Sequence, residues 1–253
     1  MLFRSVFMDT YAAQALHHMH RWGTTPEQLA TVAAKNHNYA VNNPRAQYRF
    51  PMTVEQVLAD RPVTPPLTRS MCAPVGDGAA AVLVASSEFV ARMPPPVRRR
   101  VVRVAATTLT SGTYRGPGEP GLSAVAAERA YRRAGLTPAD VDVAEVHDAT
   151  AFSEIYQTEM LGFCEPGQGG PLAESGETGP GGRIPVNTSG GLLSKGHPVA
   201  ASGLSMITEI AVQLRGEAGA RQVNGARVGL VENGGGILGL EEAACAVTVL
   251  QKA

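Results

Sequence analysis

Strand-like and helical segments alternate through the second part of the chain, and this alternation limits the possible folds more than any other feature. A strand, a helix and another strand in that order favour parallel strands covered by helices, because the connecting helix packs back onto the sheet. The helical segment ends at Gly135, a residue suited to the left-handed conformation that terminates helices. We therefore expect an α/β domain over residues 97–253. The predicted elements are a strand at 101–108, a helix at 124–134, strands at 141–146 and 226–231, and a last strand at 243–250.

Polar residues stand at the ends of two of these strands. His147 and Asp148 follow one strand, and Glu232 and Asn233 follow another. Functional groups of parallel sheets tend to lie just beyond the carboxyl ends of the strands. His147 is therefore a candidate site residue. A helix-capping or structural histidine is the alternative that the residues themselves leave open.

A glycine-rich stretch at residues 186–198 ends in Gly196-His197-Pro198 and leads into a helical pattern. Glycines let the backbone approach a ligand closely, and proline suits the first position of a helix. The positive end of a helix disfavours protonation of a nearby imidazole, so His197 is a candidate base. The alternative is a histidine packed into a turn, with glycines that serve only the bend. The apolar face of the expected helix is Ala200, Leu204, Ile207, Ala211 and Leu214.

The first part of the chain reads as helices followed by an extended segment. Thr25 before Pro26 is a helix start, because a hydroxyl cap precedes a proline at the first position. A glycine-rich turn and an apolar run at 74–84 predict a strand that is covered on both faces. The other predicted segments are helices at 8–22, 29–38 and 54–59, extended chain at Pro62, Pro65 and Pro66, a helix after Asp148 with Glu154 and Glu159 in solvent, and a surface loop at 165–183.

Composition excludes several classes of protein. The 22 basic and 22 acidic residues balance, whereas a nucleic-acid-binding protein would show a basic excess. No apolar stretch approaches the length of a membrane helix. Three widely spaced cysteines fit buried thiols in a reducing compartment, so we expect a soluble cytoplasmic protein. His17, His18 and His20 spread around a helix, so no metal site is predicted there.

The stretch Asn-x-Ser-Gly-Gly-x-x-x-x-Gly-His-Pro resembles the Gly-His-Pro signature of the thiolase superfamily. Asp77-Gly78-Ala79-Ala80-Ala81 resembles the last strand of the N-terminal half in that family, and residues 24–46 resemble its helical loop domain. His147-Asp148 resembles the His-Asp-Cys-Phe motif of the sterol-carrier-protein-x type, with Ala149 and Thr150 as departures. The residues that match the Gly-His-Pro signature are Asn187, Ser189, Gly190, Gly191, Gly196, His197, Pro198 and Gly203.

The resemblance implies a layered αβαβα thiolase fold with a complete C-terminal half and only part of the N-terminal half. Met1–Ser5 reads as a cloning or assembly artefact, and the chain is expected to be truncated at its N-terminus. The implied domains are a helical loop domain at 6–70, the last strand of the N-terminal half at 71–92, a proline linker at 93–96 and the C-terminal thiolase domain at 97–253.

The resemblance also implies roles for particular residues. His197 would activate a cysteine nucleophile, His147 would help form the oxyanion hole, and Glu232 stands where many thiolases have a second cysteine that acts as acid and base. The substrate is a coenzyme A thioester, and no cofactor or metal is expected. The implied substrate-binding residues are Asn187, Ser189, Gly190, Gly191, Gly196, Asn233, Gly234 and Gly235.

The implied function is an acyl-CoA acyltransferase that performs Claisen condensation or thiolytic cleavage of 3-ketoacyl-CoA. The nucleophile would lie upstream of Met1, so the chain alone is expected to be inactive. Two alternatives stay open: a retro-aldolase on sterol side-chain CoA thioesters that works with a partner subunit, and a non-catalytic acyl-CoA or lipid carrier. The expected partners are acyl-CoA, a second copy in a homodimer, and a small acyl-CoA-binding subunit, with no nucleic acid and no membrane.

Overall fold

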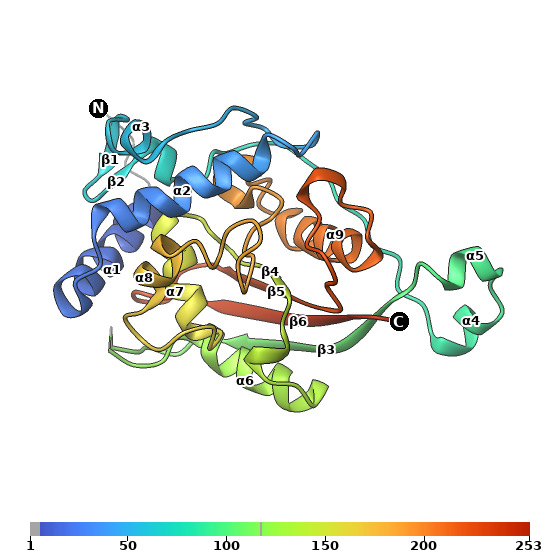
Figure 1. Cartoon of the computed structure of the whole chain (residues 1–253). Helices are drawn as coiled ribbons and strands as arrows, with labels where there is room; N and C mark the ends of the chain where they lie inside the picture. The colour runs from blue at the N-terminus through green and yellow to red at the C-terminus, as the bar shows by residue number, and fades with distance from the viewer. Residues whose placement is uncertain (1–5, 117) are drawn as a thin grey trace.

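A four-stranded mixed sheet forms the centre of the computed structural model, which describes residues 6–116 and 118–253 (Figure 1). Its strand order is β3-β6-β5-β4. Strands β4 and β5 are parallel, as the sequence predicts, whereas β6 is antiparallel to both β5 and β3. The strand–helix–strand order that favours parallel strands does not apply to β6, because the chain returns from β5 through a short loop without a crossover helix. The strands are β3 (Val102–Ser111), β4 (Val143–Glu145), β5 (Val228–Gly235) and β6 (Ala244–Lys252).

Helices cover both faces of the sheet. Helix α6 (Leu122–Ala134) packs on one face through small residues such as Ala126 and Ala130, and it ends at the left-handed Gly135 as predicted. Helix α9 (Ser202–Arg215) packs on the other face, and Figure 1 shows the two helices on opposite sides. These layers confirm the α/β class that the alternation of segments predicts.

Helix α9 differs from its prediction in two ways. It begins at Ser202, because the Pro198 carbonyl first accepts the N–H groups of Ala201 and Ser202 in a turn, so Pro198 is not the first helical residue. The predicted apolar face is confirmed only in part, because Leu214 is buried and Ile207 packs against the core, whereas Leu204 is exposed. The residues that face the sheet are Met206, Ile210 and Leu214, and the polar Glu209 and Gln213 are buried with them.

The N-terminal helices lie beside α9 and pack on helices of the second part of the chain (Figure 1). Helices α1 (Val6–Trp22), α2 (Pro26–Ala40) and α3 (Val54–Leu58) confirm the predicted helices. The Thr25 hydroxyl caps α2 by accepting the Gln28 N–H at 3.2 Å. Helix α2 is buried over most of its surface and packs on α7 (Ala151–Met160) and α8 (Gly169–Glu174). Because α8 lies within residues 165–183, that segment is not simply a surface loop.

The predicted strand at residues 74–84 is not formed. These residues belong to neither sheet, and Leu83 and Val84 are almost fully exposed. An apolar run becomes a covered strand only when strands lie beside it and helices lie over it, and the described residues supply neither here. Within the predicted proline linker at 93–96, Pro94 is the N-cap of a short helix, α5 (Pro95–Arg98).

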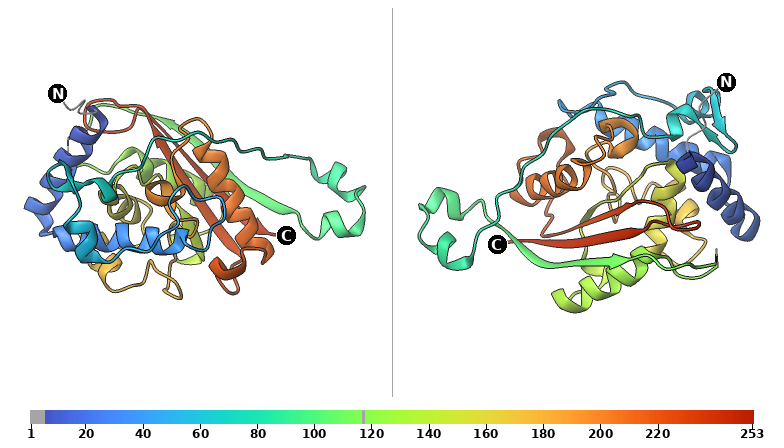
Figure 2. Two further views of the ribbon diagram at one scale, coloured as in Figure 1. Left: turned by 90° about the horizontal axis from the view of Figure 1, so that it is seen from above. Right: turned by 180° about the vertical axis from the view of Figure 1, so that it is seen from behind.

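Short elements complete the fold. They are the β1–β2 hairpin (Pro62–Thr64 and Leu67–Thr68), α4 (Ser87–Ala91), the 3₁₀ helices η1 (Arg69–Met71), η2 (Pro138–Asp140) and η4 (Gly219–Arg221), and the π-helix η3 (Gly191–Lys195). Helices α4 and α5 stand apart from the sheet in all views (Figure 2). Among the described ranges, no helix has the length and apolar character that crossing a bilayer requires. The Met1–Ser5 prediction lies outside the described residues.

Candidate active site

Two loops at one edge of the sheet bring His147 and His197 together. Val186, at the start of the glycine-rich loop, forms a parallel β-bridge with Ala144 of β4. The loop therefore leaves the sheet next to the end of β4. The two imidazole rings lie 5.2 Å apart between centroids, in an edge-to-face arrangement of 73°. The pair predicted from separate motifs is therefore one structural unit.

His197 is held so that one ring nitrogen is available to a substrate. Its Nδ1 lies 2.8 Å from the Ser202 hydroxyl, which in turn donates to the Pro198 carbonyl at 3.3 Å. That arrangement assigns the ring proton to Nδ1 and leaves Nε2 as the basic nitrogen. Burial, and then the Lys195 ammonium, lower the pKa of His197. The imidazole is thus neutral at pH 7, as a base must be. The cause differs from the prediction, because burial and Lys195 lower the pKa, whereas the sequence suggested the effect of a helix N-terminus.

His147 is neutral for a similar reason. Burial, followed by the neighbouring His197, lowers its pKa to about 3. Its backbone N–H donates to Glu232 Oε2 at 3.0 Å, and its ring Nδ1 lies 3.8 Å from Glu242 Oε1 without a hydrogen-bond partner in the described chain. A neutral imidazole whose position is set by its own backbone can donate one N–H to a developing oxyanion.

A buried carboxyl group lies behind His147. Glu232 is fully buried on β5 and accepts the His147 N–H and the Cys245 thiol, the latter at 3.3 Å. Burial raises the pKa of Glu232 to about 7. Burial and the nearby Glu232 and Glu241 also raise the pKa of Glu242. A carboxyl group that titrates near neutrality can both give and take a proton.

Asp148 ties the His147 loop to the glycine-rich loop. Its buried carboxyl accepts the Leu192 N–H at 2.6 Å and the Leu193 N–H at 3.4 Å. The Asn36 amide of α2 donates to the same carboxyl at 2.9 Å. Gly191 has a positive φ of 59°, and a Cβ there would collide with the Asp148 carboxyl. This glycine is therefore required by packing within the protein.

Glu154 connects helix α2 to the same loops. It is 1% exposed, contrary to the prediction that it lies in solvent, and it forms an ion pair with Lys35. It also accepts the Asn36 amide at 2.9 Å and the Asn187 amide at 2.7 Å. Asn187 accepts the Val146 N–H at 2.9 Å and adopts a left-handed φ of 58°. Its amide is thus engaged with the protein on both sides.

The other predicted substrate-binding residues differ in their surroundings. Ser189 is bonded to buried Glu145 through its N–H at 2.9 Å and its hydroxyl at 2.6 Å. Gly235, in contrast, has open space at the position of a Cβ. At the remaining positions a neighbouring residue lies close to where a Cβ would stand: Ala40 at Gly190, Gln47 at Gly196 and Glu242 at Gly234, while the Asn233 amide lies near Gly203. Substrate contact at these residues stays a prediction.

Several residues of the site carry no signal in the sequence. Lys35, Asn36, Glu154 and Glu242 look like ordinary surface residues until the tertiary structure buries them. Glu159 was likewise expected in solvent and is buried with His18, which bonds Thr24 at 2.7 Å and Glu159 at 3.1 Å. Within the described ranges, no three His, Cys, Asp or Glu side chains are grouped as metal ligands.

Comparison with known proteins places this chain in a family. Residues 121–250, which include both histidines and Glu232, match the thiolase C-terminal domain-like family. This chain belongs to the thiolase family. It is 43% identical over 231 residues to an acetyl-CoA acetyltransferase of Methanothermobacter thermautotrophicus, covering 91% of this chain and 60% of that protein.

Further relatives support the family and show how much of it the chain spans. A sterol carrier protein 2 of Oryctolagus cuniculus is 40% identical, covering 85% of this chain and 41% of the relative. The benzoylsuccinyl-CoA thiolase subunit BbsB of Thauera aromatica is 34% identical, covering 87% and 57%. A chain of a solved Ltp2-ChsH2(DUF35) aldolase has the same fold, with a TM-score of 0.84 at 24% identity, covering 98% and 64%. This thiolase-family chain thus spans between two fifths and two thirds of these relatives.

The buried Glu232 predicts how the stability of this thiolase-family chain depends on pH. A carboxyl whose pKa is raised from 4.5 to about 7 contributes stability fully below pH 4.5, and this contribution is lost as pH rises through 7. We expect the free energy of unfolding of the wild type, relative to Glu232→Gln, to fall between those values and to stay constant above them. Urea unfolding at pH 4.5, 5.5, 6.5 and 7.5 measures this. The exposed Glu128→Gln is the control, and a difference independent of pH would contradict the expectation.

Proposed function

We propose that this chain supplies the acid–base part of an acyl-CoA acyltransferase site that cleaves or forms 3-ketoacyl-CoA. The observation that carries the proposal is the pair of neutral imidazoles, His147 and His197, 5.2 Å apart at the edge of the sheet. One neutral imidazole can accept a thiol proton while the other donates to the carbonyl oxygen of the substrate. Both functions are needed wherever a thiol attacks a ketone or a thioester.

The proposed roles follow from the contacts of each residue. His197 takes the proton of the attacking thiol at Nε2, because its Nδ1 is engaged by Ser202. His147 stabilises the oxygen that becomes negative. Glu232 gives a proton to the α-carbon when the carbon–carbon bond breaks and removes it when the bond forms, which suits a carboxyl with a pKa of about 7. Coenzyme A thioesters serve as substrates, and no cofactor enters these steps.

We propose that the nucleophilic cysteine lies outside these 253 residues. Burial raises the pKa of Cys72 and of Cys164 to about 12, which disfavours the reactive thiolate. Cys245 is fully buried and donates to Glu232, and the pKa of its thiol is also raised by burial and by that carboxyl. Within the described chain, the hydrogen bonds of His197 run to Ser202 and to no cysteine.

Aldol cleavage of a CoA thioester is the second candidate. Ala149 and Glu232 occupy the two positions where the family resemblance leads one to expect cysteine, and this substitution favours chemistry without a second thiol. The chain also shares its fold with an aldolase chain that is named together with a second protein, and a named relative is a thiolase subunit. A partner subunit is therefore proposed along with this candidate, whereas a homodimer accompanies the acyltransferase.

The products of the reaction distinguish the candidates. We expect the natural protein that contains this chain to convert acetoacetyl-CoA and CoA into two acetyl-CoA, and the isolated 253 residues to show no turnover. Release of an aldehyde or ketone from a 3-hydroxyacyl-CoA would support aldol cleavage instead. Binding of acyl-CoA with neither product would identify a carrier. Turnover by the isolated chain would overturn the assignment of the nucleophile.

A further inference from the structure

Nδ1 of His147 is a buried polar atom that the proposed roles do not account for. It has no hydrogen-bond partner among the residues that the structure describes, although only 8% of the side chain is exposed. Native proteins keep few buried polar atoms without a partner, because each one destabilises the fold. The Glu242 carboxyl faces this nitrogen, with Oε1 at 3.8 Å from Nδ1. The unpartnered nitrogen and the carboxyl therefore form a candidate pair.

Strand β5 makes the space that the Glu242 carboxyl occupies. A Cβ at Gly234 would lie 2.2–2.5 Å from the three atoms of that carboxyl group, so a side chain at this position would displace it. Glu232, two residues earlier on β5, accepts the backbone N–H of His147 at 3.0 Å. One strand thus holds the backbone of His147 with one carboxyl and leaves room for a second carboxyl beside the ring.

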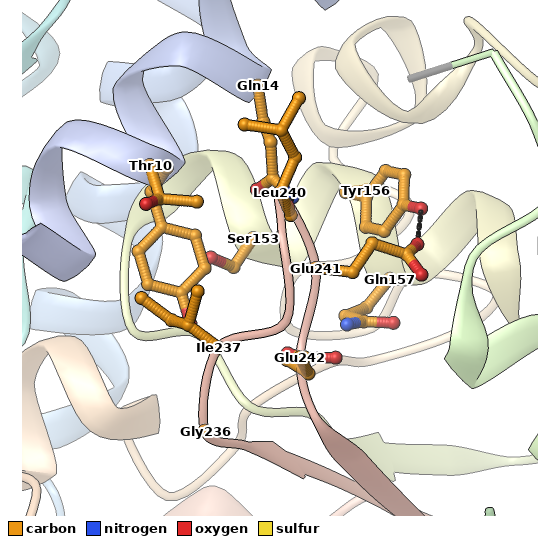
Figure 3. A pocket seen from close by; sticks show the side chains of 11 residues that line it. Thr10, Gln14, Ser153, Tyr156, Gln157, Gly236, Ile237, Leu240, Glu241 and Glu242 are labelled. Atoms are coloured by element: carbon orange, nitrogen blue, oxygen red, sulfur yellow. Dashed lines mark hydrogen bonds between the residues drawn. The ribbon is translucent and has the colours of Figure 1, made fainter. Parts of the chain in front are cut away.

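A small cavity adjoins Glu242. Figure 3 shows Glu242 in its wall, together with Ser153 and Gln157 of α7. Its volume of about 20 Å³ is enough for one water molecule, so the carboxyl has space in which to move. A hydrogen bond to nitrogen spans about 2.7–3.2 Å, so a shift of roughly 1 Å closes the present gap. Hydrogen bonds of catalytic groups are often long in the free protein and tighten when the substrate binds.

The surroundings of Glu242 favour its protonated form. Burial, followed by Glu232 and Glu241, raises its pKa well above the usual range. The Arg115 guanidinium forms its ion pair with Glu241, at 3.2 Å. A protonated carboxyl can donate its O–H to Nδ1, whereas an ionised carboxylate can only accept.

No cation stands among the titratable groups that surround Glu242 in the described chain. The His147 imidazole is neutral, because burial and His197 lower its pKa to about 3. The other groups are acids or neutral donors, so they do not favour the ionised carboxylate. The full set is Tyr11 of α1, His147 after β4, Tyr156 of α7, Glu232 of β5, Glu241 beside it and Cys245 of β6.

We propose that Glu242 is a positioning residue that determines which ring nitrogen of His147 carries the proton. Its carboxyl O–H donates to Nδ1, so the ring proton stays on Nε2 and is available to the substrate oxygen. When the pair loses one proton to solvent, the proton that remains lies on Nδ1, facing the carboxylate, and Nε2 no longer donates. The inference rests on the proposed function, because it takes His147 as the donor to the oxyanion.

NMR measures the tautomer of His147 directly. Long-range proton–nitrogen correlation spectra of the natural protein with isotope-labelled histidine show which nitrogen carries the proton, and the His147 signals are those missing from His147→Asn. We expect Nε2–H at about pH 6 and a change to Nδ1–H as the pH rises through the raised pKa of Glu242. Glu242→Gln offers an amide N–H at every pH and should keep Nε2–H throughout. The exposed Glu128→Gln should behave as the wild type does.

Acyl-transfer rates give a second measurement. Glu242→Met removes the donor to Nδ1, so the ring loses its anchor, and kcat should fall by about 10- to 100-fold with little change in KM. Glu242→Gln should retain most of the rate, and it should lack the alkaline fall in kcat that accompanies the tautomer change in the wild type. A melting temperature of Glu242→Gln equal to that of the wild type guards this comparison against misfolding.

The outcomes separate this inference from the proposed function. The role of Glu242 would be overturned by Nδ1–H at pH 6, by a tautomer that does not change with pH in the wild type, by a change that persists in Glu242→Gln, or by a wild-type kcat in Glu242→Met. The tautomer is measured without turnover. A change that depends on Glu242 in a protein that does not thiolyse acetoacetyl-CoA refutes only the acyltransferase, and thiolysis with a tautomer independent of Glu242 refutes only this inference.

Discussion

Replacing His197 by alanine is expected to lower kcat for acyl transfer by about 10²- to 10⁴-fold, the usual contribution of a positioned base. The side chain is partly exposed at the site and makes one side-chain hydrogen bond, to Ser202. Its removal therefore takes away the catalytic base and has only a small effect on the stability of the fold. Steady-state thiolysis rates of the natural protein, with thermal melting of the same samples, measure the two effects separately.

Controls for this variant come from the chain itself. His20→Ala removes an exposed imidazole on α1 and should leave the rate unchanged. Ser202→Ala leaves the imidazole in place and removes the group that selects its tautomer, so a smaller loss of about tenfold is expected. Because the pKa of His197 is lowered, the acidic limb of the kcat/KM profile should lie below pH 6.5. A His197→Ala rate within a few-fold of wild type would refute the role of base.

Replacing Lys35 by methionine is expected to lower the free energy of unfolding by about 3–5 kcal/mol. The Lys35 ammonium is the charged partner of Glu154, and both side chains are shielded, with 10% and 1% of their surface exposed. Methionine fills a similar volume but leaves a buried carboxylate without its counter-charge. Since Glu154 also holds Asn187 at the start of the glycine-rich loop, acyl transfer should fall with stability. Urea unfolding monitored by circular dichroism measures the loss.

A double variant separates charge from packing. In the Lys35→Met background, Glu154→Gln removes the unpaired charge and keeps a side chain that can bond to Asn36 and Asn187. We expect it to recover more than half of the lost stability. Lys252→Met, an exposed change of the same kind, should be neutral within about 0.5 kcal/mol. A Lys35→Met loss below about 1 kcal/mol would show that the buried ion pair contributes little.

Features that depend on neighbouring residues could be predicted from the sequence. The cap at Thr25, the helix end at Gly135, the strand at 243–250 and the buried Cys245 all agree with the structure. The Gly-His-Pro motif also predicted the family that the comparisons show. Each of these signals lies within a few residues, where backbone geometry and hydrogen bonding are set locally.

The errors arise where a pattern needs distant partners. Residues 74–84 have the apolar run of a covered strand, yet a strand forms only beside another strand, and none of the described strands lies there. Helix α9 begins at Ser202 and not at the predicted Pro198, because the Pro198 carbonyl accepts hydrogen bonds in a turn before the helix. Glu154 looks like a surface residue in the sequence, since its partner Lys35 is 119 residues away.

The sequence by itself determined the α/β class, the thiolase resemblance and the identity of the two histidines. Only the tertiary structure decided that these imidazoles lie 5.2 Å apart in an edge-to-face arrangement, and that burial raises the pKa of Glu232 to about 7. It also decided that α2 contacts both loops through Asn36 and Lys35. The physical reason is burial. Removal from water shifts the pKa of a group and makes each buried polar atom require a partner, and burial depends on residues that are far apart in the chain.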